Sequence, residues 1–186
     1  MMITESDSPI TTQINPDLNV CIVKENVVTG KKTWYYAKNI VTNDGDLYYA
    51  QQAVEETPTS DFGGSNGRME LRTGSATPAK ADVFTQVTTP IPTSIQPMNS
   101  GYPKTNDSDS DNTGAGTDIV TWLASWTTSD FNSNAIIGGC IHVAGGASGA
   151  TTAGATKLLS HFSLTSFNKT SSDTLKIFVN HTFNGT

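Results

Sequence analysis

A short acidic stretch carries the residues of this sequence that are best suited to hold a metal ion. It reads Asn-Asp-Ser-Asp-Ser-Asp-Asn and repeats a carboxylate at every second position, at Asp107, Asp109 and Asp111. Asp118 is the twelfth residue counted from Asp107 and takes the place of the glutamate that ends a calcium loop. Asn112 also departs from that pattern, and no helices are expected on either side. The stretch predicts either a structural calcium site or a solvated acidic loop.

Histidine and cysteine are the other residue types here that could bind a metal or react. The three histidines, His142, His161 and His181, each fall in a stretch with strand character. A zinc site needs four convergent ligands, and the spacing gives no paired motif, so we interpret these histidines as structural or exposed. Cys21 and Cys140 lie far apart in the sequence, and we expect two buried free thiols.

Two glycine-containing stretches resemble catalytic motifs but lack essential parts of them. Residues 146–150 read Gly-Ala-Ser-Gly-Ala, which misses the last glycine of a nucleophile elbow. Residues 29–33 read Thr-Gly-Lys-Lys-Thr, but the upstream glycine of a phosphate-binding loop is missing and a strand follows. The sequence therefore predicts a protein that is not an enzyme and that has no cofactor apart from the hypothetical calcium.

Composition sets the fold class that must position these residues. The chain has 186 residues, 35% hydrophobic and only 15% charged, with 28 Thr and 18 Ser. Threonine and serine suit half-exposed strands and turns, whereas the helix formers are sparse. The net charge of −6 argues against binding to a nucleic-acid backbone. The start of the chain lacks the pattern of a secretory signal, and no run of 18 apolar residues predicts a membrane span.

Hydrophobic patterning predicts a mainly β chain, an antiparallel β-sandwich or jelly roll with one short helix, an extended N-terminal arm and long loops. Strands are expected at 19–23, 33–37, 69–72, 83–87, 119–126, 135–143, 157–164 and 174–183. The helix should begin with Asp46 as its cap and end before Pro58. Its apolar residues, Leu47, Ala50 and Val54, recur at helical spacing.

The expected domain organisation is an arm followed by one domain. Residues 1–18 contain Pro9 and Pro16 without sustained periodicity, so we expect an arm that is ordered by docking. Residues 19–186 form a single domain in this interpretation, with a proline-punctuated, loop-rich segment at 57–118.

The last predicted strand shows which side chains should form a core. Leu175, Ile177 and Val179 share one face, and Phe178 is an apolar residue on the other face, either covered by a loop or used against a neighbour. Trp122 and Trp126, four residues apart on one strand face, are interpreted as core anchors.

Three segments together resemble the virion proteins of tailed bacteriophages. Residues 39–45 read Asn-Ile-Val-Thr-Asn-Asp-Gly, residues 73–82 read Thr-Gly-Ser-Ala-Thr-Pro-Ala-Lys-Ala-Asp, and residues 167–177 read Phe-Asn-Lys-Thr-Ser-Ser-Asp-Thr-Leu-Lys-Ile. They are similar in type and order to a turn before a short helix, a Thr-Gly…Pro-Ala…Asp stretch and a final strand of such proteins, although Arg72 departs from the pattern. The resemblance implies assembly rather than turnover, and it brings no catalytic residues.

The resemblance implies a capsid decoration or cement protein, made in the host cytoplasm and located on the capsid surface of the virion. Its expected partners are the major capsid protein and copies of itself, with a trimer favoured, and neither nucleic acid nor membrane. Five residues are expected at interfaces: Pro9, Pro16, Pro90, Tyr102 and Phe178.

Two alternatives remain open at the level of sequence. A tail-fibre, tail-tip or adaptor component would bind a host receptor, through Trp34, Tyr35 and Tyr36. A secreted carbohydrate-binding or carbohydrate-active module is disfavoured, because glycoside hydrolysis needs two positioned acids.

Overall fold

The computed structural model describes residues 18–58, 61–63, 66–143 and 157–183, and most of their regular structure is β-strand. The strands are β1 (Val20–Asn26), β2 (Lys32–Val41), β3 (Gly67–Arg72), β4 (Gln96–Pro97), β5 (Lys104–Thr105), β6 (Ile119–Trp126), β7 (Ser133–Val143), β8 (Leu158–Lys169) and β9 (Asp173–Thr182). The helices are α1 (Asn43–Ala53) and the 3-10 helices η1 (Phe84–Gln86) and η2 (Pro92–Ser94). The prediction of a mainly β chain with one α-helix is confirmed for this part of the chain. The predicted arm, with Pro9 and Pro16, lies outside it apart from Leu18.

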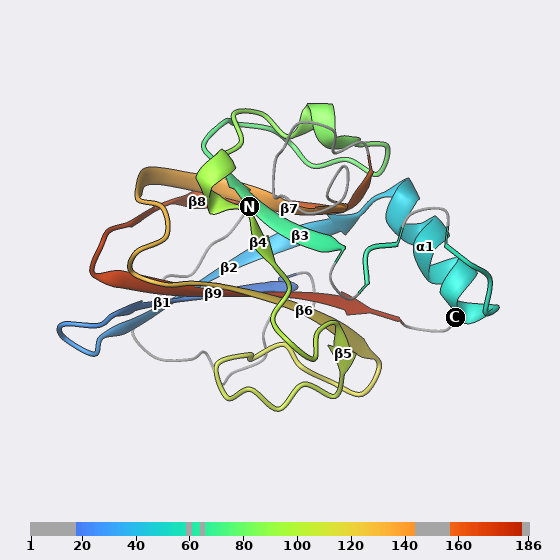
Figure 1. Ribbon diagram of the computed structural model, residues 1–186, viewed down its shortest axis with the longest axis horizontal. Coiled ribbons are helices and arrows are strands. Elements are labelled where there is room, and N and C mark those ends of the chain that lie inside the picture. The colour runs from blue at the N-terminus through green and yellow to red at the C-terminus, as the bar shows by residue number, and fades with distance from the viewer. Residues whose placement is uncertain (1–17, 59–60, 64–65, 144–156, 184–186) are drawn as a thin grey trace.

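The strands described here form one antiparallel sheet that curls on itself. Their order is β4-β3-β7-β8-β2-β1-β9-β6-β5. The long strand β2 pairs with β1 through residues 32–37 and with β8 through residues 38–41, so it passes from one half of the sheet into the other. In Figure 1, β3, β7 and β8 accordingly lie above β1, β9 and β6. The inner faces of the two halves enclose the main core.

Alternation along β9 decides which side chains enter this core. Leu175, Ile177 and Val179 point into it, as their spacing predicts. Phe178 points to the outer face and is fully buried there, which fits the alternative that it is covered and not the alternative that it is exposed to a neighbour. It belongs to a second apolar cluster, here called the outer cluster. Its buried members are Cys21, Val23, Trp34, Tyr36, Leu123 and Phe178.

The two tryptophans of β6 anchor the inner core, as predicted. Trp122 and Trp126 are both fully buried there. Their indole N–H groups also have acceptors, because Trp126 Nε1 lies 2.7 Å from the Ser94 carbonyl and Trp122 Nε1 lies 2.8 Å from Tyr49 Oη. Burial of Trp122 and Trp126 therefore leaves neither of their two indole donors without a partner.

The helix differs from its prediction in its cap. Thr42, not Asp46, is the N-cap residue, and its hydroxyl accepts a hydrogen bond from the Gly45 backbone N–H. Gly45 is required by packing, since a Cβ at this position would lie 2.3 Å from the Leu159 carbonyl oxygen on β8. A threonine cap and a close approach to β8 thus fix where α1 begins.

The face of α1 that packs against the core is also not the predicted one. Tyr48 is buried against Phe62, with its ring edge-on to the phenyl ring. Leu47, Ala50 and Val54, the apolar positions at helical spacing, are exposed. The stripe that would normally face a core therefore faces away from the body of this molecule.

Residues 91–105, here called the edge strap, cover both edges of the curled sheet. Along β3, the Ile91 N–H donates to the Leu71 carbonyl and β4 pairs with the strand. Along β6, the Asn99 N–H donates to the Leu123 carbonyl and β5 pairs with the strand. Proline-rich, two-residue edge strands are a common way to protect a sheet edge.

The predicted strand at 83–87 is the other local error. These residues contain η1 and belong to residues 73–90, here called the covering loop, which packs on β7 and β8 through Phe84 and Val87. Pro90, at its end, is half-buried and lies opposite Arg72 in a single antiparallel bridge. No helix among the described residues combines the length and the apolar character that crossing a membrane requires.

Candidate functional site

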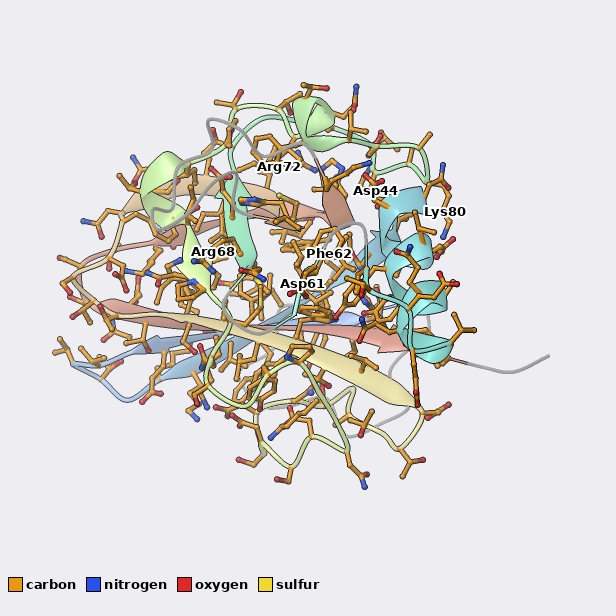
Figure 2. All side chains as sticks on the ribbon, turned by 45° about the vertical axis from the view of Figure 1, so that its right-hand side comes forward. Asp44, Asp61, Phe62, Arg68, Arg72 and Lys80 are labelled. Atoms are coloured by element: carbon orange, nitrogen blue, oxygen red, sulfur yellow. The ribbon has the colours of Figure 1, made fainter. Side chains whose placement is uncertain are left out.

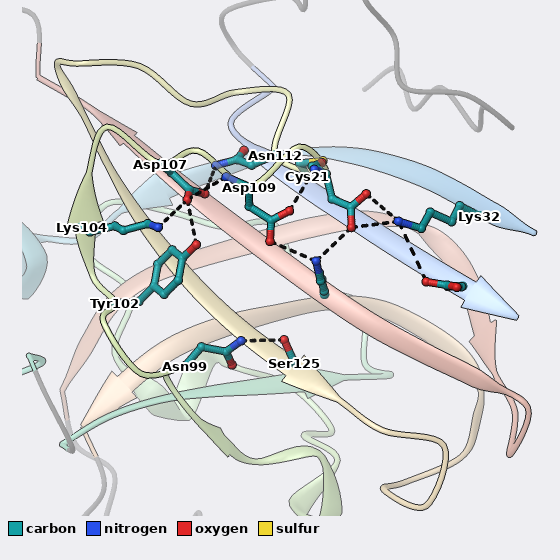
Figure 3. Close-up of polar contacts among 12 residues, drawn as sticks. Cys21, Lys32, Asn99, Tyr102, Lys104, Asp107, Asp109, Asn112 and Ser125 are labelled. Atoms are coloured by element: carbon teal, nitrogen blue, oxygen red, sulfur yellow. Dashed lines mark hydrogen bonds and ion pairs between the residues drawn. The ribbon is translucent and has the colours of Figure 1, made fainter. Parts of the chain in front are cut away.

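The predicted calcium loop folds onto the outer face of β1, β9 and β6, where its carboxylates meet lysines (Figure 3). Asp107 accepts hydrogen bonds from Tyr102 Oη at 2.8 Å and from Asn112 Nδ2 at 2.9 Å, and Lys104 Nζ lies 2.9 Å away. Burial alone would raise the pKa of Asp107, but these hydrogen bonds outweigh it and lower the pKa to about 2. Tyr102, predicted at an interface, is half-buried and serves this network.

The other two carboxylates of the loop are held by lysines from the sheet. Lys176 Nζ lies 3.0 Å from both Asp109 and Asp111, and Lys32 Nζ lies 2.9 Å from Asp111. Burial raises the pKa of Asp111, and the hydrogen bonds from Lys32 and Lys176 more than reverse this, so its pKa is lowered. Residues 106–114, here called the acidic loop, are therefore fastened to β2 and β9 by charge.

This geometry gives the calcium hypothesis no support. The carboxylates bind lysine ammonium groups, and Asp118 instead accepts the Phe183 N–H with its backbone carbonyl. No group of three or more His, Cys, Asp or Glu side chains in the described part of the chain could hold a metal ion. The acidic loop instead covers the outer cluster, since the Cys21 thiol donates to the Asp111 carbonyl at 3.4 Å.

A second set of charged residues is buried on the opposite outer face, beneath the covering loop. Glu70 lies 3.3 Å from His142 Nε2, and His161 Nδ1 lies 2.8 Å from Asp82 of the covering loop. Burial lowers the pKa of His161, against the raising effect of Asp82, so the imidazole donates as a neutral group. The three histidines, expected to be structural or exposed, are all buried.

Arg72 is the largest charged side chain in this layer and is fully buried (Figure 2). Its guanidinium donates to the carbonyls of Gly74 and Ala76 in the covering loop, and to the carbonyl of Phe162 on β8. Gly138 of β7 provides the space, because a Cβ there would lie 2.7 Å from Arg72 Nε. The arginine therefore binds the covering loop to the sheet.

A cavity of about 450 Å³ lies where α1 meets the end of β9. Its lining residues are Val41, Asp46, Tyr49, Lys80, His181, Thr182 and Phe183. Tyr49 Oη lies 2.6 Å from His181 Nδ1, and Asn39 Nδ2 lies 2.9 Å from His181 Nε2. Together with the bond from Trp122, these contacts form a hydrogen-bonded chain from β6 through α1 to β9 and β2.

Two groups of this hydrogen-bonded chain, Tyr49 and His181, are poorly suited to proton transfer near neutral pH. Burial raises the pKa of Tyr49 far above its ordinary value, and burial lowers the pKa of His181 to about 3. A general acid or base works best when its pKa lies near the operating pH. The chain of hydrogen bonds therefore positions α1 rather than supplying a catalytic acid or base.

The two cysteines are free and buried, as predicted. Burial raises the pKa of Cys21 to about 11 and the pKa of Cys140 well above its ordinary value. Because the thiolate is the nucleophilic form, both side chains are held in an unreactive state at neutral pH.

Exposed apolar side chains gather at two opposite ends of the molecule. Val27 and Val28 lie in the β1–β2 turn, with 52% and 79% of their surface exposed. Leu47 of α1 and Val54, the C-cap residue of this helix, are 47% and 65% exposed. The turn and the helix lie at opposite ends of the longest axis (Figure 1). Val83 is also exposed, but it belongs to the covering loop and lies at neither of these two ends.

Neither of these exposed apolar ends was predicted from the sequence. Of the five expected interface residues, Phe178 is buried, Pro90 and Tyr102 are half-buried, and Pro9 and Pro16 lie outside the described residues. The helical spacing of Leu47, Ala50 and Val54 was the available signal, but the direction in which that stripe points depends on the packing of Tyr48 and Gly45.

The aromatic residues proposed for receptor binding are also buried. Trp34 and Tyr36 belong to the outer cluster, and Tyr35 stacks on Phe167 in the inner core. The receptor surface that the tail-fibre alternative required is therefore not formed by these residues.

Comparison with family models, with curated proteins and with solved structures found no match to this chain.

Proposed function

We propose that this chain is a non-enzymatic structural protein of a tailed-phage virion, which decorates the capsid and braces its subunits. The observation that carries the proposal is the placement of exposed apolar residues at two opposite ends of the long axis. A protein with two contact sites facing away from each other can link two neighbours, which is what bracing a shell requires. We infer that the curled sheet is a variant of the β-sandwich.

The polar groups of the interior support a mechanical role over a catalytic one. Tyr49, His181, Cys21 and Cys140 have pKa values far from neutrality, which suits hydrogen bonding and packing rather than proton transfer or nucleophilic attack. Both outer faces of the sheet are covered by loops that lysine or arginine side chains fasten. A domain with loops fastened in this way is suited to resist deformation by mechanical force.

The test is binding to empty capsids assembled from the major capsid protein encoded in the same genome. Cosedimentation should saturate at a fixed ratio of this chain to capsid subunits, and bound protein should raise the melting temperature of the capsid. The variant Val28→Asp/Val54→Asp should lose the rise in melting temperature, whereas Val83→Asp should retain it. Absence of binding at saturating protein would overturn the proposal.

A further inference from the structure

The cavity where α1 meets the end of β9, here called the α1–β9 cavity, has an aromatic wall. Phe183 lines it and leaves 45% of its surface exposed, although a phenyl ring gains by leaving water. Its backbone N–H donates to the Asp118 carbonyl at 2.9 Å, and its ring meets the Tyr49 ring edge to face, with 4.7 Å between the ring centroids. The phenyl ring is therefore held in place with part of its surface available to a ligand.

Tyr49 is the fixed part of this wall. Its hydroxyl accepts the indole N–H of Trp122 at 2.8 Å and lies 2.6 Å from His181 Nδ1, and its ring lies edge to face against the imidazole. These contacts come from β6 and β9, so Tyr49 is anchored to the sheet as well as to its own helix. The aromatic wall is thus formed before a ligand arrives, which reduces the cost of binding.

The polar wall of the cavity comes from the covering loop and the helix. The Lys80 carbonyl accepts the Asn43 N–H at 2.8 Å, which places this part of the loop beside α1 (Figure 2). Lys80 Nζ then lies 2.5 Å from an Asp46 carboxylate oxygen, and the two side chains are 51% and 55% exposed. An ammonium has three donors and a carboxylate has two acceptor oxygens, so this contact leaves both groups able to bond a ligand.

The charge of the lining decides which class of ligand fits. Among the described lining residues, Asp46 and Lys80 carry opposite charges that neutralise each other, while burial lowers the pKa of His181 to about 3 and keeps its imidazole neutral. A simple anion or cation would be attracted by one member of the ion pair and repelled by the other. A wholly apolar ligand would remove both charges from water without replacing their hydrogen bonds. The cavity therefore suits a neutral molecule that combines hydroxyl groups with an apolar face.

We propose that the α1–β9 cavity binds a neutral saccharide. The apolar C–H face of a pyranose ring packs on Phe183, while the sugar hydroxyls donate to Asp46 and accept from Lys80. The cavity volume of about 450 Å³ lies in the range of pockets that hold small ligands. This site goes beyond the proposed function, because bracing a capsid requires no sugar, and it adds recognition of a glycan to a structural protein.

The test is an NMR titration of the isotope-labelled full chain with glucose, galactose, mannose and N-acetylglucosamine. At least one sugar should bind saturably with millimolar affinity, and the amide signals that shift should cluster at Asp46, Tyr49, Lys80 and Phe183. Added sodium chloride should leave the affinity within about twofold, since the ligand carries no charge. Sodium acetate is the contrasting probe, and saturable binding of acetate in place of every sugar would identify an anion site and overturn the proposal.

Variants of each wall show which groups hold the sugar. Phe183→Ala removes the aromatic surface and should weaken binding roughly tenfold. Asp46→Asn keeps the shape of the side chain but loses its charge, and it should weaken binding by about threefold or more. Leu47→Ala is the matched control, because Leu47 is 47% exposed and follows Asp46 on α1 but does not line the cavity. Its affinity should equal that of the wild-type protein.

Three results would contradict a saccharide site. One is the absence of saturable binding for all of these sugars, and another is a set of shifted signals that lies away from the cavity. The third is equal affinity of the Phe183→Ala and Leu47→Ala proteins, once urea denaturation shows that both are folded. Capsids are absent from the titration, so its outcome is independent of the capsid-binding test of the proposed function.

Discussion

At the scale of single residues, Arg72 is a buried charge whose hydrogen bonds hold a loop against the sheet. A buried guanidinium is costly unless its donors are used, and here Nη1 and Nη2 donate to the carbonyls of Gly74, Ala76 and Phe162. Burial also lowers the pKa of Arg72, which indicates that the protein environment disfavours the charged form. The Ala76 carbonyl also accepts from the Ser163 hydroxyl at 2.7 Å, so arginine and serine together hold the covering loop at this point.

Replacing Arg72 with alanine should lower the free energy of unfolding by about 2–4 kcal/mol, because several backbone acceptors lose a charged donor. Urea denaturation measures this loss. Arg68→Ala is the matched control, since Arg68 lies on the same strand four residues earlier but is only half-buried, and its effect should be clearly smaller. Equal losses of unfolding free energy in the two variants would show that the hydrogen bonds of Arg72 do not account for its contribution to stability.

His181 makes a pH-dependent contribution whose sign follows from its burial. Burial lowers its pKa to about 3 from an ordinary value of 6.5. Between these values the unfolded chain binds a proton that the folded chain does not. The stabilisation is therefore fully present above pH 6.5 and is lost as the pH falls toward 3, by up to about 1.4 kcal/mol per pH unit.

The variant His181→Gln should show a shallower dependence of unfolding free energy on pH between 6 and 4, by up to about 1.4 kcal/mol per unit. Its loss of stability at pH 7 reports the hydrogen bonds to Tyr49 and Asn39, so the slope separates titration from lost contacts. The pKa of His161 is lowered too, but His161 is present in both proteins and cancels in the comparison. Parallel curves would contradict the assignment.

At the scale of elements, the acidic loop is a cover held in place by lysines. Lys176 joins it to β9 through Asp109 and Asp111, and Cys21 lies beneath it. Lys176→Met keeps the side-chain length but loses the charge, so the loop should open more often. Reaction of Cys21 with a thiol reagent should become roughly threefold to tenfold faster, as expected for the loss of two partly exposed ion pairs.

Cys140 serves as the control for this experiment within the same molecule. It is buried beneath the covering loop with Phe84 and Val87, away from the acidic loop. Its rate of modification, followed separately by mass spectrometry, should not change. Equal acceleration at both cysteines would indicate general destabilisation rather than opening of the acidic loop.

The longer strands could be predicted from the sequence because each carries its own signal, whereas the two-residue strands β4 and β5 were not predicted. The alternating residues of β9 and the paired tryptophans of β6 identify core faces without knowledge of the rest of the fold. The error at 83–87 has a physical reason, since those residues bury Phe84 and Val87 on β7 and β8 from a loop without joining the sheet. A short apolar run signals burial but not the backbone geometry by which it is buried.

Which apolar residues are exposed could not be predicted in the same way because exposure depends on tertiary packing. Phe178 has the sequence pattern of an exposed residue, but a loop some 70 positions earlier in the chain covers it. Leu47, Ala50 and Val54 have the pattern of a core face, but Tyr48 and the close packing of Gly45 turn them outward. The aspartates likewise have a calcium-like spacing, and only the fold brings Lys32 and Lys176 to them.

At the scale of the whole molecule, the edge strap joins the two ends of the curled sheet. Ser94 is its central link, since its hydroxyl accepts the Leu71 N–H of β3 at 2.8 Å and its carbonyl accepts the Trp126 indole N–H of β6 at 2.7 Å. A single residue thus contacts both edge regions. Replacement of Ser94 should therefore weaken the protection of backbone amides from hydrogen exchange at both edges of the sheet.

Ser94→Ala removes the acceptor for Leu71 and should cost about 1–3 kcal/mol, because a buried backbone N–H is left without a partner. Amide hydrogen exchange should accelerate at Leu71 and also at Asn99, whose N–H bonds Leu123 on the β6 side. Val179, on the interior strand β9 between β1 and β6, should keep the protection set by global unfolding, and it serves as the internal reference. Acceleration confined to Leu71 would contradict the view that the strap opens as one unit, because a strap that joins both edges must release both when its central link fails.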